Sequence, residues 1–226
     1  MEFIAQNTSV PVPRIVTAFE SRKSGIRYIV MTRLPGTRLD VVWHQMSEES
    51  RKDVIRQLRG YMDQIRALKP PTPGYIGSVN HTPLEDDRIF HGTFGPFSSV
   101  EEFHRAARAG VTDPTTGPEM DNLRKLIDDH SRTQSTVCFT HGDLAFRNIM
   151  VKDGRITGIF DWELAGWLPY YWEYSNSWFS FWDTPNWRPL IDGFLDPYPW
   201  ELEMEKLRRK LFGKLHHLHR LECALR

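Results

Sequence analysis

The stretch of sequence that decides the fold is residues 141–148, His141-Gly142-Asp143-Leu144-Ala145-Phe146-Arg147-Asn148. Asp161 follows thirteen residues after Asn148. The residues between them predict two short strands around an Asp153-Gly154 turn, a dipeptide typical of two-residue hairpins. Such a hairpin returns Asn148 and Asp161 to one open end, with Asp143 just upstream. The sequence therefore predicts that three oxygen-bearing side chains converge.

The spacing of Asp143 and Asn148 is that of a phosphoryl-transfer catalytic loop. Mg²⁺ binds hard oxygen ligands and usually takes one or two carboxylates, with phosphate and water completing its shell. Asp161 and the carboxamide of Asn148 suit that role, which leaves Asp143 to orient an acceptor hydroxyl and take its proton. The alternative is that these are ordinary turn residues, because Asp, Asn and Gly gather in loops for backbone reasons.

The segments FTHGDLAFRNIMV and ITGIFDWELAGW resemble the catalytic loop and metal-binding segment of the aminoglycoside phosphotransferase family, which has a protein-kinase-like fold. The segments NTSVPVPRIV, RYIVMTRLPGTRLDVVW, GPFSSVEEF and GWLPYYWEY resemble its fungal-type members, in the same order. The resemblance covers residue 1 to about residue 182. It implies an α+β fold with a mainly helical C-lobe over residues 35–226. Residues 1–34 would then be a remnant of the N-lobe and the hinge.

By that resemblance, Asp143 is the catalytic base, Asn148 and Asp161 bind Mg²⁺, and ATP is the phosphate donor. The interlobe hinge, whose backbone meets adenine, would consist of Thr32, Arg33 and Leu34. We expect three further residues to support the site: His141 by bracing the loop, Arg147 by contacting a phosphate, and Glu163 by lying near the metal. The alternative for Arg147 is simple solvation.

The resemblance also implies parts that this sequence lacks. A glycine-rich loop and a strand lysine normally hold the phosphates, and the helix glutamate that pairs with the lysine would fall before Met1. The single lysine ahead of the hinge is Lys23, in a polar turn between strands expected over residues 14–19 and 26–32. If this is the whole natural product, we expect severely impaired catalysis; a truncated gene product is an equal explanation. We also expect an oligomer or partner to cover the open strand edge.

Composition argues against nucleic-acid binding and a disulfide-rich fold, and it indicates where the protein is located. The chain has 226 residues, with 29 basic and 29 acidic ones, so no electrostatic footprint for nucleic acid is present. Two cysteines, Cys138 and Cys223, do not form a disulfide framework, which fits a reducing compartment. With neither a leader pattern nor a membrane span in the sequence, we expect a cytoplasmic protein.

Helical periodicity and capping residues predict the rest of the C-lobe. Ser47 should cap a helix that ends near Leu68, and Ser98 should open another through a capping box with Glu101. Further elements are expected over residues 119–130 (helix), 137–140 (strand) and 201–225 (helix).

The segment 162–187 is unusually aromatic. We predict that most of its rings form core, because aromatic side chains dominate core burial. The alternative is a platform for a cationic acceptor, since aromatic faces attract cations and Glu163, Glu173 and Asp183 lie nearby.

Two function hypotheses remain, with a distant third. The first is an ATP-dependent phosphotransferase that acts on an unidentified small hydroxylated or amino-bearing molecule. The second is a non-catalytic kinase-like binding module, favoured by the absent glycine loop and lysine. The third is a metallohydrolase that uses His141, Asp143 and Asp161.

Overall fold

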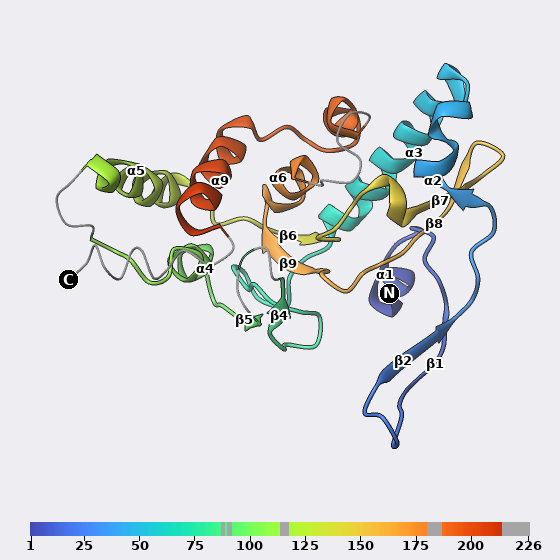
Figure 1. The fold of residues 1–226 in the computed structure, drawn as a ribbon, viewed down its shortest axis with the longest axis horizontal. Coiled ribbons are helices and arrows are strands. Elements are labelled where there is room, and N and C mark those ends of the chain that lie inside the picture. Colours follow the sequence, from blue (N-terminus) through green and yellow to red (C-terminus); the bar gives the residue numbers. More distant parts are fainter. Residues whose placement is uncertain (87–88, 90–91, 114–117, 180–186, 214–226) are drawn as a thin grey trace. The chain divides into compact units, whose positions relative to one another are not determined.

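The computed structural model describes residues 1–86, 89, 92–113, 118–179 and 187–213 (Figure 1). The chain forms two compact units and passes between them several times. The first unit contains residues 1–68, 143–163 and 176–196. The second contains residues 69–142, 164–175 and 197 onward. The expected boundary between residues 34 and 35 stays a prediction.

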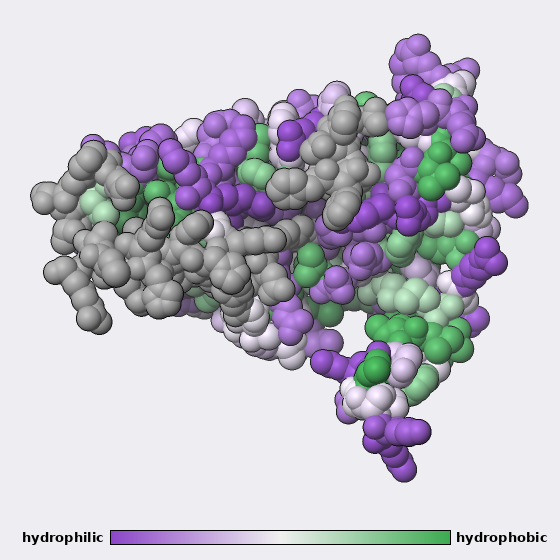
Figure 2. Space-filling view, viewed as in Figure 1, coloured by the Kyte–Doolittle hydropathy of each residue, from purple (hydrophilic) through white to green (hydrophobic). Residues whose placement is uncertain are grey.

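The first unit begins with α1 (Glu2–Asn7) and a hairpin of β1 (Ile15–Glu20) and β2 (Arg27–Met31). The strands pair antiparallel from Ile15↔Met31 to Glu20↔Arg27, which confirms the predicted hairpin. Lys23 is exposed in its turn. Both faces carry exposed apolar side chains, and Figure 2 shows green, hydrophobic atoms over this hairpin: Val16, Phe19, Ile26, Tyr28, Ile29, Val30 and Met31. A pair of strands this open buries little of its own surface.

A three-stranded antiparallel sheet lies at the centre of the first unit, in the order β3 (Thr37–Arg38), β7 (Ile149–Lys152) and β8 (Arg155–Ile159). The short helices α2 (Leu39–Val42), η1 (Trp43–Gln45) and η2 (Phe146–Asn148) lead into and out of it. Helix α3 (Glu48–Ala67) packs on β8 and on α8 (Ile191–Phe194), which continues η4 (Arg188–Leu190). The sheet thereby joins segments far apart in sequence.

Helix α3 forms as predicted. The Ser47 hydroxyl accepts a hydrogen bond from the backbone N–H of Ser50, and two glutamates occupy the first turn, where the helix dipole favours negative charge. Its buried residues recur every three or four positions and so face one side of the helix: Val54, Leu58, Met62 and Ile65.

The second unit is mainly helical. It contains α4 (Val100–Ala107), α5 (Pro118–Arg132) and α9 (Pro199–Phe212), and α6 (Trp172–Trp178) runs from it into the first unit. Its strands are β4 (Leu84–Glu85) paired with β5 (Thr93–Phe94), and β6 (Val137–Thr140) paired with β9 (Gly166–Pro169). The predicted helix over 119–130 and strand over 137–140 are confirmed. The expected C-terminal helix is described as far as Phe212, and its residues 214–225 lie outside the described ranges.

The predicted cap of α4 was wrong by one residue. Ser99, not Ser98, caps the helix by accepting a hydrogen bond from the N–H of Glu102. The Glu102 carboxylate then accepts bonds from both the N–H and the hydroxyl of Ser98, each at 2.8 Å. The sequence allows either register, and the observed one satisfies this additional pair of donors.

The aromatic segment forms core, as predicted for most of its rings. Phe139 of β6 meets Trp167 of β9 edge to face, and Phe103 of α4 meets Trp172 in the same way. Trp178 and Phe179 are half-buried, whereas Phe181, Trp182 and Asp183 lie outside the described residues. The fully buried members are Trp162, Trp167, Tyr170, Tyr171, Trp172, Tyr174 and Trp187.

Two buried histidines stack between α4 and α5. The rings of His104 and His130 lie 4.1 Å apart with an interplanar angle of 9°. Burial lowers the pKa of His104 to about 3 and that of His130 to about 2, from an ordinary value of 6.5. Both rings are therefore neutral in the folded protein, and the positive charge of Arg108 reinforces this effect.

Acidification should therefore destabilise the second unit. Between about pH 6.5 and pH 3 the unfolded chain binds protons that the folded chain excludes, so the free energy of unfolding falls as pH falls. We expect a loss of about 1.4 kcal/mol per pH unit for each histidine. Urea unfolding at pH 7.5 and pH 5.5 measures this, and His130→Gln should flatten the slope. His44→Gln, at an exposed position, should leave the slope unchanged.

Candidate active site

The β7–β8 hairpin positions the first pair of predicted site residues. Asp153 and Gly154 both adopt positive φ, at 50° and 72°, as a type I′ turn requires. The strands pair from Lys152↔Arg155 at the turn to Ile149↔Ile159 at the open end. Beyond them, the N–H of Phe160 donates to the carbonyl oxygen of Asn148 at 3.0 Å. Asn148 and the neighbour of Asp161 are thus held together, as the sequence indicated.

Asp143 is bound to this end by Asn148. The Asn148 Nδ2 donates to the Asp143 carbonyl oxygen at 2.8 Å and to its Oδ2 at 3.0 Å. Asn148 is buried, with 2% of its surface exposed. Because the amide nitrogen faces Asp143, the carboxamide oxygen is turned away from that carboxylate. A metal ligand at this position needs that orientation, since an amide coordinates through its oxygen.

Asp161 is the third residue of the predicted site, and both its carboxyl pKa and its backbone conformation are unusual. Partial burial raises the pKa of its carboxyl, the nearby charge of Asp143 raises it further, and Arg147 opposes both effects. Its φ of +67° lies in the left-handed region, which costs a non-glycine residue roughly 1 kcal/mol or more. A divalent cation beside Asp161 and Asn148 would relieve the repulsion between the two carboxylates.

Arg147 has a partner that the sequence analysis missed. Its guanidinium donates to the Asp143 Oδ2 at 2.5 Å. Residues 143–145 are not helical and only η2 follows them, so the contact depends on the loop conformation and not on a helical spacing. The ion pair fixes the direction of the Asp143 carboxylate. The expected phosphate contact of Arg147 stays a prediction.

In the second unit, the backbone of the segment before Asp143 is held by Glu173. The fully buried Glu173 carboxylate accepts hydrogen bonds from the N–H of His141 at 2.5 Å and from the N–H of Gly142 at 3.3 Å. Gly142 has a φ of +84°, and a Cβ there would lie 2.5 Å from the Leu164 carbonyl oxygen. Only glycine fits this position.

The suggestion that Glu173 faces a cationic acceptor was therefore wrong. Its carboxylate is enclosed in the fold and engaged with backbone donors, whereas Glu163 is exposed. His141 is also fully buried, which agrees with a bracing role, although that role stays a prediction.

The predicted hinge lines a small hollow in the first unit. Thr32, Arg33 and Leu34 surround about 230 Å³ together with residues that the sequence analysis did not select: Pro13, Met31, Gly36, Met150 and Phe160. Met150 follows Asn148 by two positions and Phe160 precedes Asp161, so the hollow and the carboxylates share one hairpin. Its mostly apolar wall suits a flat heterocycle with hydrogen bonds to backbone.

The hairpin is tied to the hinge by two close contacts. The Thr157 hydroxyl donates to the Pro35 carbonyl oxygen at 2.6 Å. A Cβ at Gly158 would lie 2.3 Å from Leu34 Cδ1, so glycine allows the hinge side chain to rest directly on the strand. These contacts set the position of the hollow relative to the site residues.

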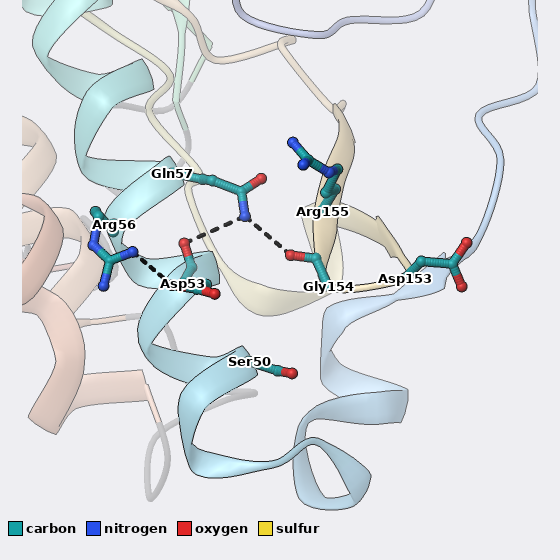
Figure 3. Close-up of a pocket in the computed structure, with 7 residues that line it drawn as sticks. All are labelled: Ser50, Asp53, Arg56, Gln57, Asp153, Gly154 and Arg155. Atoms are coloured by element: carbon teal, nitrogen blue, oxygen red, sulfur yellow. Dashed lines mark hydrogen bonds and ion pairs between the residues drawn. The ribbon is translucent and has the colours of Figure 1, made fainter.

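The closed end of the hairpin is tied to α3 by Gln57 (Figure 3). Its Nε2 donates to the Gly154 carbonyl oxygen at 3.0 Å, and its Oε1 accepts from the N–H of Ile156 at 3.0 Å. Figure 3 shows the side chain reaching from the helix to the turn beside a hollow that Asp53 and Arg155 also line. One side chain thus satisfies two backbone groups of the turn.

Gln57→Ala should destabilise the first unit by about 1–2 kcal/mol, because two partly buried backbone groups lose their partners. Urea unfolding measures the change. Lys52→Ala, on the exposed surface of the same helix, should shift the free energy by less than about 0.5 kcal/mol. Equal effects of the two substitutions would contradict a role for Gln57 at the turn.

Glu173→Ala should be more severe, because it leaves two buried backbone donors unsatisfied and opens a cavity. We expect a loss of about 3 kcal/mol or more in the free energy of unfolding. Glu163→Ala is the matched control, since Glu163 is an exposed residue close in sequence, and it should be nearly neutral. A small effect of Glu173→Ala would mean that the loop before Asp143 is held by other contacts.

An aspartate and an asparagine five positions apart, followed by a second aspartate, are the residue types and spacing of a phosphoryl-transfer site. The chain belongs to the phosphotransferase enzyme family, whose model matches residues 1–208. The family resemblance and the α+β, kinase-like fold expected from the sequence are both confirmed. A search of curated proteins finds no match.

Solved structures agree on the fold. Aminoglycoside phosphotransferase APH(4)-Ia matches with a TM-score of 0.64 and 20% identity, over 92% of this chain and 71% of that one. A thermostable mutant of it, in a ternary complex with ADP and hygromycin B, matches at 0.60 with 18% identity and the same coverage. The GDP and kanamycin complex of APH(2″)-IIia matches at 0.56 with 14% identity, over 99% of this chain and 73% of that one. Across the similar structures, the chain spans between 65% and 78% of their lengths.

Within the described ranges, no group of three His, Cys, Asp or Glu side chains could hold a metal ion. In the same part of the chain, no helix has the length and apolar character that crossing a bilayer requires.

Proposed function

We propose that this protein is an ATP-dependent phosphotransferase that phosphorylates a hydroxyl group of a small molecule in the cytoplasm. The observation that supports this most is the hydrogen-bonded group of Asp143, Arg147 and Asn148 beside Asp161. The family and the nucleotide complexes of similar structures support the donor chemistry.

In this proposal Asp143 is the catalytic base. Its Oδ2 is held by Arg147 and Asn148, so the carboxylate is fixed in direction before the acceptor arrives. It orients the acceptor hydroxyl and takes up its proton as the bond to phosphorus forms. Arg147 pairs with this carboxylate, and its guanidinium also suits a contact with the transferred phosphoryl group.

The carboxylate of Asp161 and the carboxamide oxygen of Asn148 would hold Mg²⁺, since both are hard oxygen ligands. When bound, the ion neutralises charge on the phosphate oxygens. The backbone of Thr32, Arg33 and Leu34 would hold adenine in the hollow, against Met150 and Phe160.

Substitutions at Asp143 and Asp161 test this proposal, with a control at the turn of the hairpin. Asp143→Asn should lower turnover by about 10²–10⁴-fold and leave nucleotide binding intact, because it removes the base alone. Asp161→Asn should weaken Mg²⁺-dependent ATP binding, measured by titration calorimetry. Asp153→Asn is the matched control: the same change at the far end of the hairpin, where Asn also tolerates positive φ. Turnover unaffected by Asp143→Asn would refute the catalytic assignment.

The second candidate is a kinase-like module that binds nucleotide without turnover, which the hollow at Thr32, Arg33 and Leu34 favours by itself. The same variants separate the two. Two results together would establish this second function. The wild-type protein should bind Mg²⁺-ATP, with binding abolished in Asp161→Asn. It should also show no measurable phosphoryl transfer to water or to polyhydroxylated amines.

A further inference from the structure

A second hollow lies entirely within the second unit, among residues that the proposed reaction does not use. It measures about 650 Å³ and lies between α4 and α5 and the segment that leads into β6. Its polar wall includes His104, Arg108, Thr112, His130 and Ser135.

The central feature of this hollow is a buried positive charge. Arg108 is 7% exposed. Its Nε donates to the Val111 carbonyl oxygen at 2.7 Å, and its Nη1 lies 3.1 Å from His130 Nδ1. Among the described residues, no carboxylate oxygen lies within ion-pair distance of its guanidinium. Arg208, which is also buried, is by contrast paired with Glu205 at 2.6 Å. Buried charges in proteins are normally paired directly, and no described carboxylate forms such a pair with Arg108.

The two histidines beside Arg108 are neutral, and their hydrogen bonds fix which ring nitrogen carries the proton. Because the guanidinium can only donate, His130 Nδ1 must accept, which places the ring proton on Nε2. The Thr133 hydroxyl donates to the His130 carbonyl oxygen, so the nearby His104 Nδ1 carries its own proton and His104 Nε2 accepts from the Tyr171 hydroxyl. Neither ring supplies a negative charge or competes as an anion.

Other charges limit what the hollow can accept. Glu101 also lines it and attracts the Arg108 guanidinium, whereas Arg105 repels it. Glu101 is an exposed residue, so solvent screens its charge, and it leaves the buried guanidinium only partly balanced. The remaining N–H groups of Arg108 form a planar fork that matches a carboxylate or phosphate. Neighbouring Glu101 would disfavour a large polyanion.

We propose that this hollow binds a small oxyanion, a carboxylate or a phosphate group, through Arg108. His130 and the hydroxyls of Thr112 and Ser135 lie on the same wall and provide further donors. The site is built from residues of one unit and does not depend on the proposed catalytic reaction.

The test measures binding of inorganic phosphate and, separately, acetate to the full chain at pH 7.5 by titration calorimetry and thermal denaturation. Sodium chloride holds the ionic strength constant. We expect saturable binding of at least one anion, and at least a tenfold weaker affinity in Arg108→Gln. Arg105→Gln, three residues earlier on the exposed side of α4, is the matched control and should bind as the wild type does. Asp161→Asn should also retain binding, which separates this site from the proposed metal site.

Saturation by phosphate alone identifies a phosphate-bearing ligand, and saturation by acetate alone identifies a carboxylate. If Arg108→Gln does not fold, Arg108→Lys keeps the charge but loses the planar fork, and its affinity should fall severalfold. The proposal is overturned if neither anion binds beyond the chloride control, or if binding is unchanged in whichever Arg108 variant is folded.

Discussion

The β7–β8 hairpin is the constraint on which the candidate site depends. Two consecutive residues with positive φ, Asp153 and Gly154, close the turn, and the antiparallel register then carries the chain back to its starting point. Because of that register, the backbone of Asn148 is hydrogen-bonded to Phe160, the residue before Asp161. A slip of one residue would turn every side chain of a strand to the opposite face and separate the pair. Two contacts from other segments stabilise this register: the hydrogen bond from Gln57 to the turn, and the packing of Leu34 on Gly158.

The open end of the hairpin stores unfavourable energy that the rest of the first unit tolerates. Asp161 combines a left-handed backbone with a carboxyl that burial and Asp143 both disfavour as an anion. Backbone strain and neighbouring like charges are common at ligand-binding sites, because the binding free energy of the ligand offsets their cost. The arrangement is therefore informative about chemistry in a way that a relaxed surface loop is not.

Three buried charged side chains of the second unit have different kinds of hydrogen-bond partner. Glu173 is satisfied by backbone donors, and Glu205 by two arginines that reach it along one helix face. Arg108 hydrogen-bonds to two neutral acceptors, the Val111 carbonyl oxygen and His130 Nδ1, and the opposite charge that acts on it is that of the exposed Glu101. In the first two arrangements each buried carboxylate is satisfied by donors, although Arg208 Nη1 is buried without a hydrogen-bond partner. The third leaves a guanidinium beside open volume, which distinguishes a place for a ligand from a structural ion pair.

Local chemistry was readable from the sequence. The Asp-Gly turn, the Ser47 cap, the strand before His141 and the helical period of α3 depend on neighbours within a few positions, so they appear in the sequence as patterns. The convergence of Asp143, Asn148 and Asp161 followed from the same turn. Even so, the cap of α4 was misplaced, because two adjacent serines offered equivalent registers and only packing selected one.

What tertiary structure alone decided involves residues far apart in the chain. No pattern signals that Glu173 binds a backbone more than thirty positions away, that Met150 and Phe160 share one hollow with Thr32, Arg33 and Leu34, or that Arg108 is buried. These outcomes depend on which side chains the packed core excludes from water. Burial and long-range pairing are properties of the whole fold, and a local sequence pattern carries no record of them.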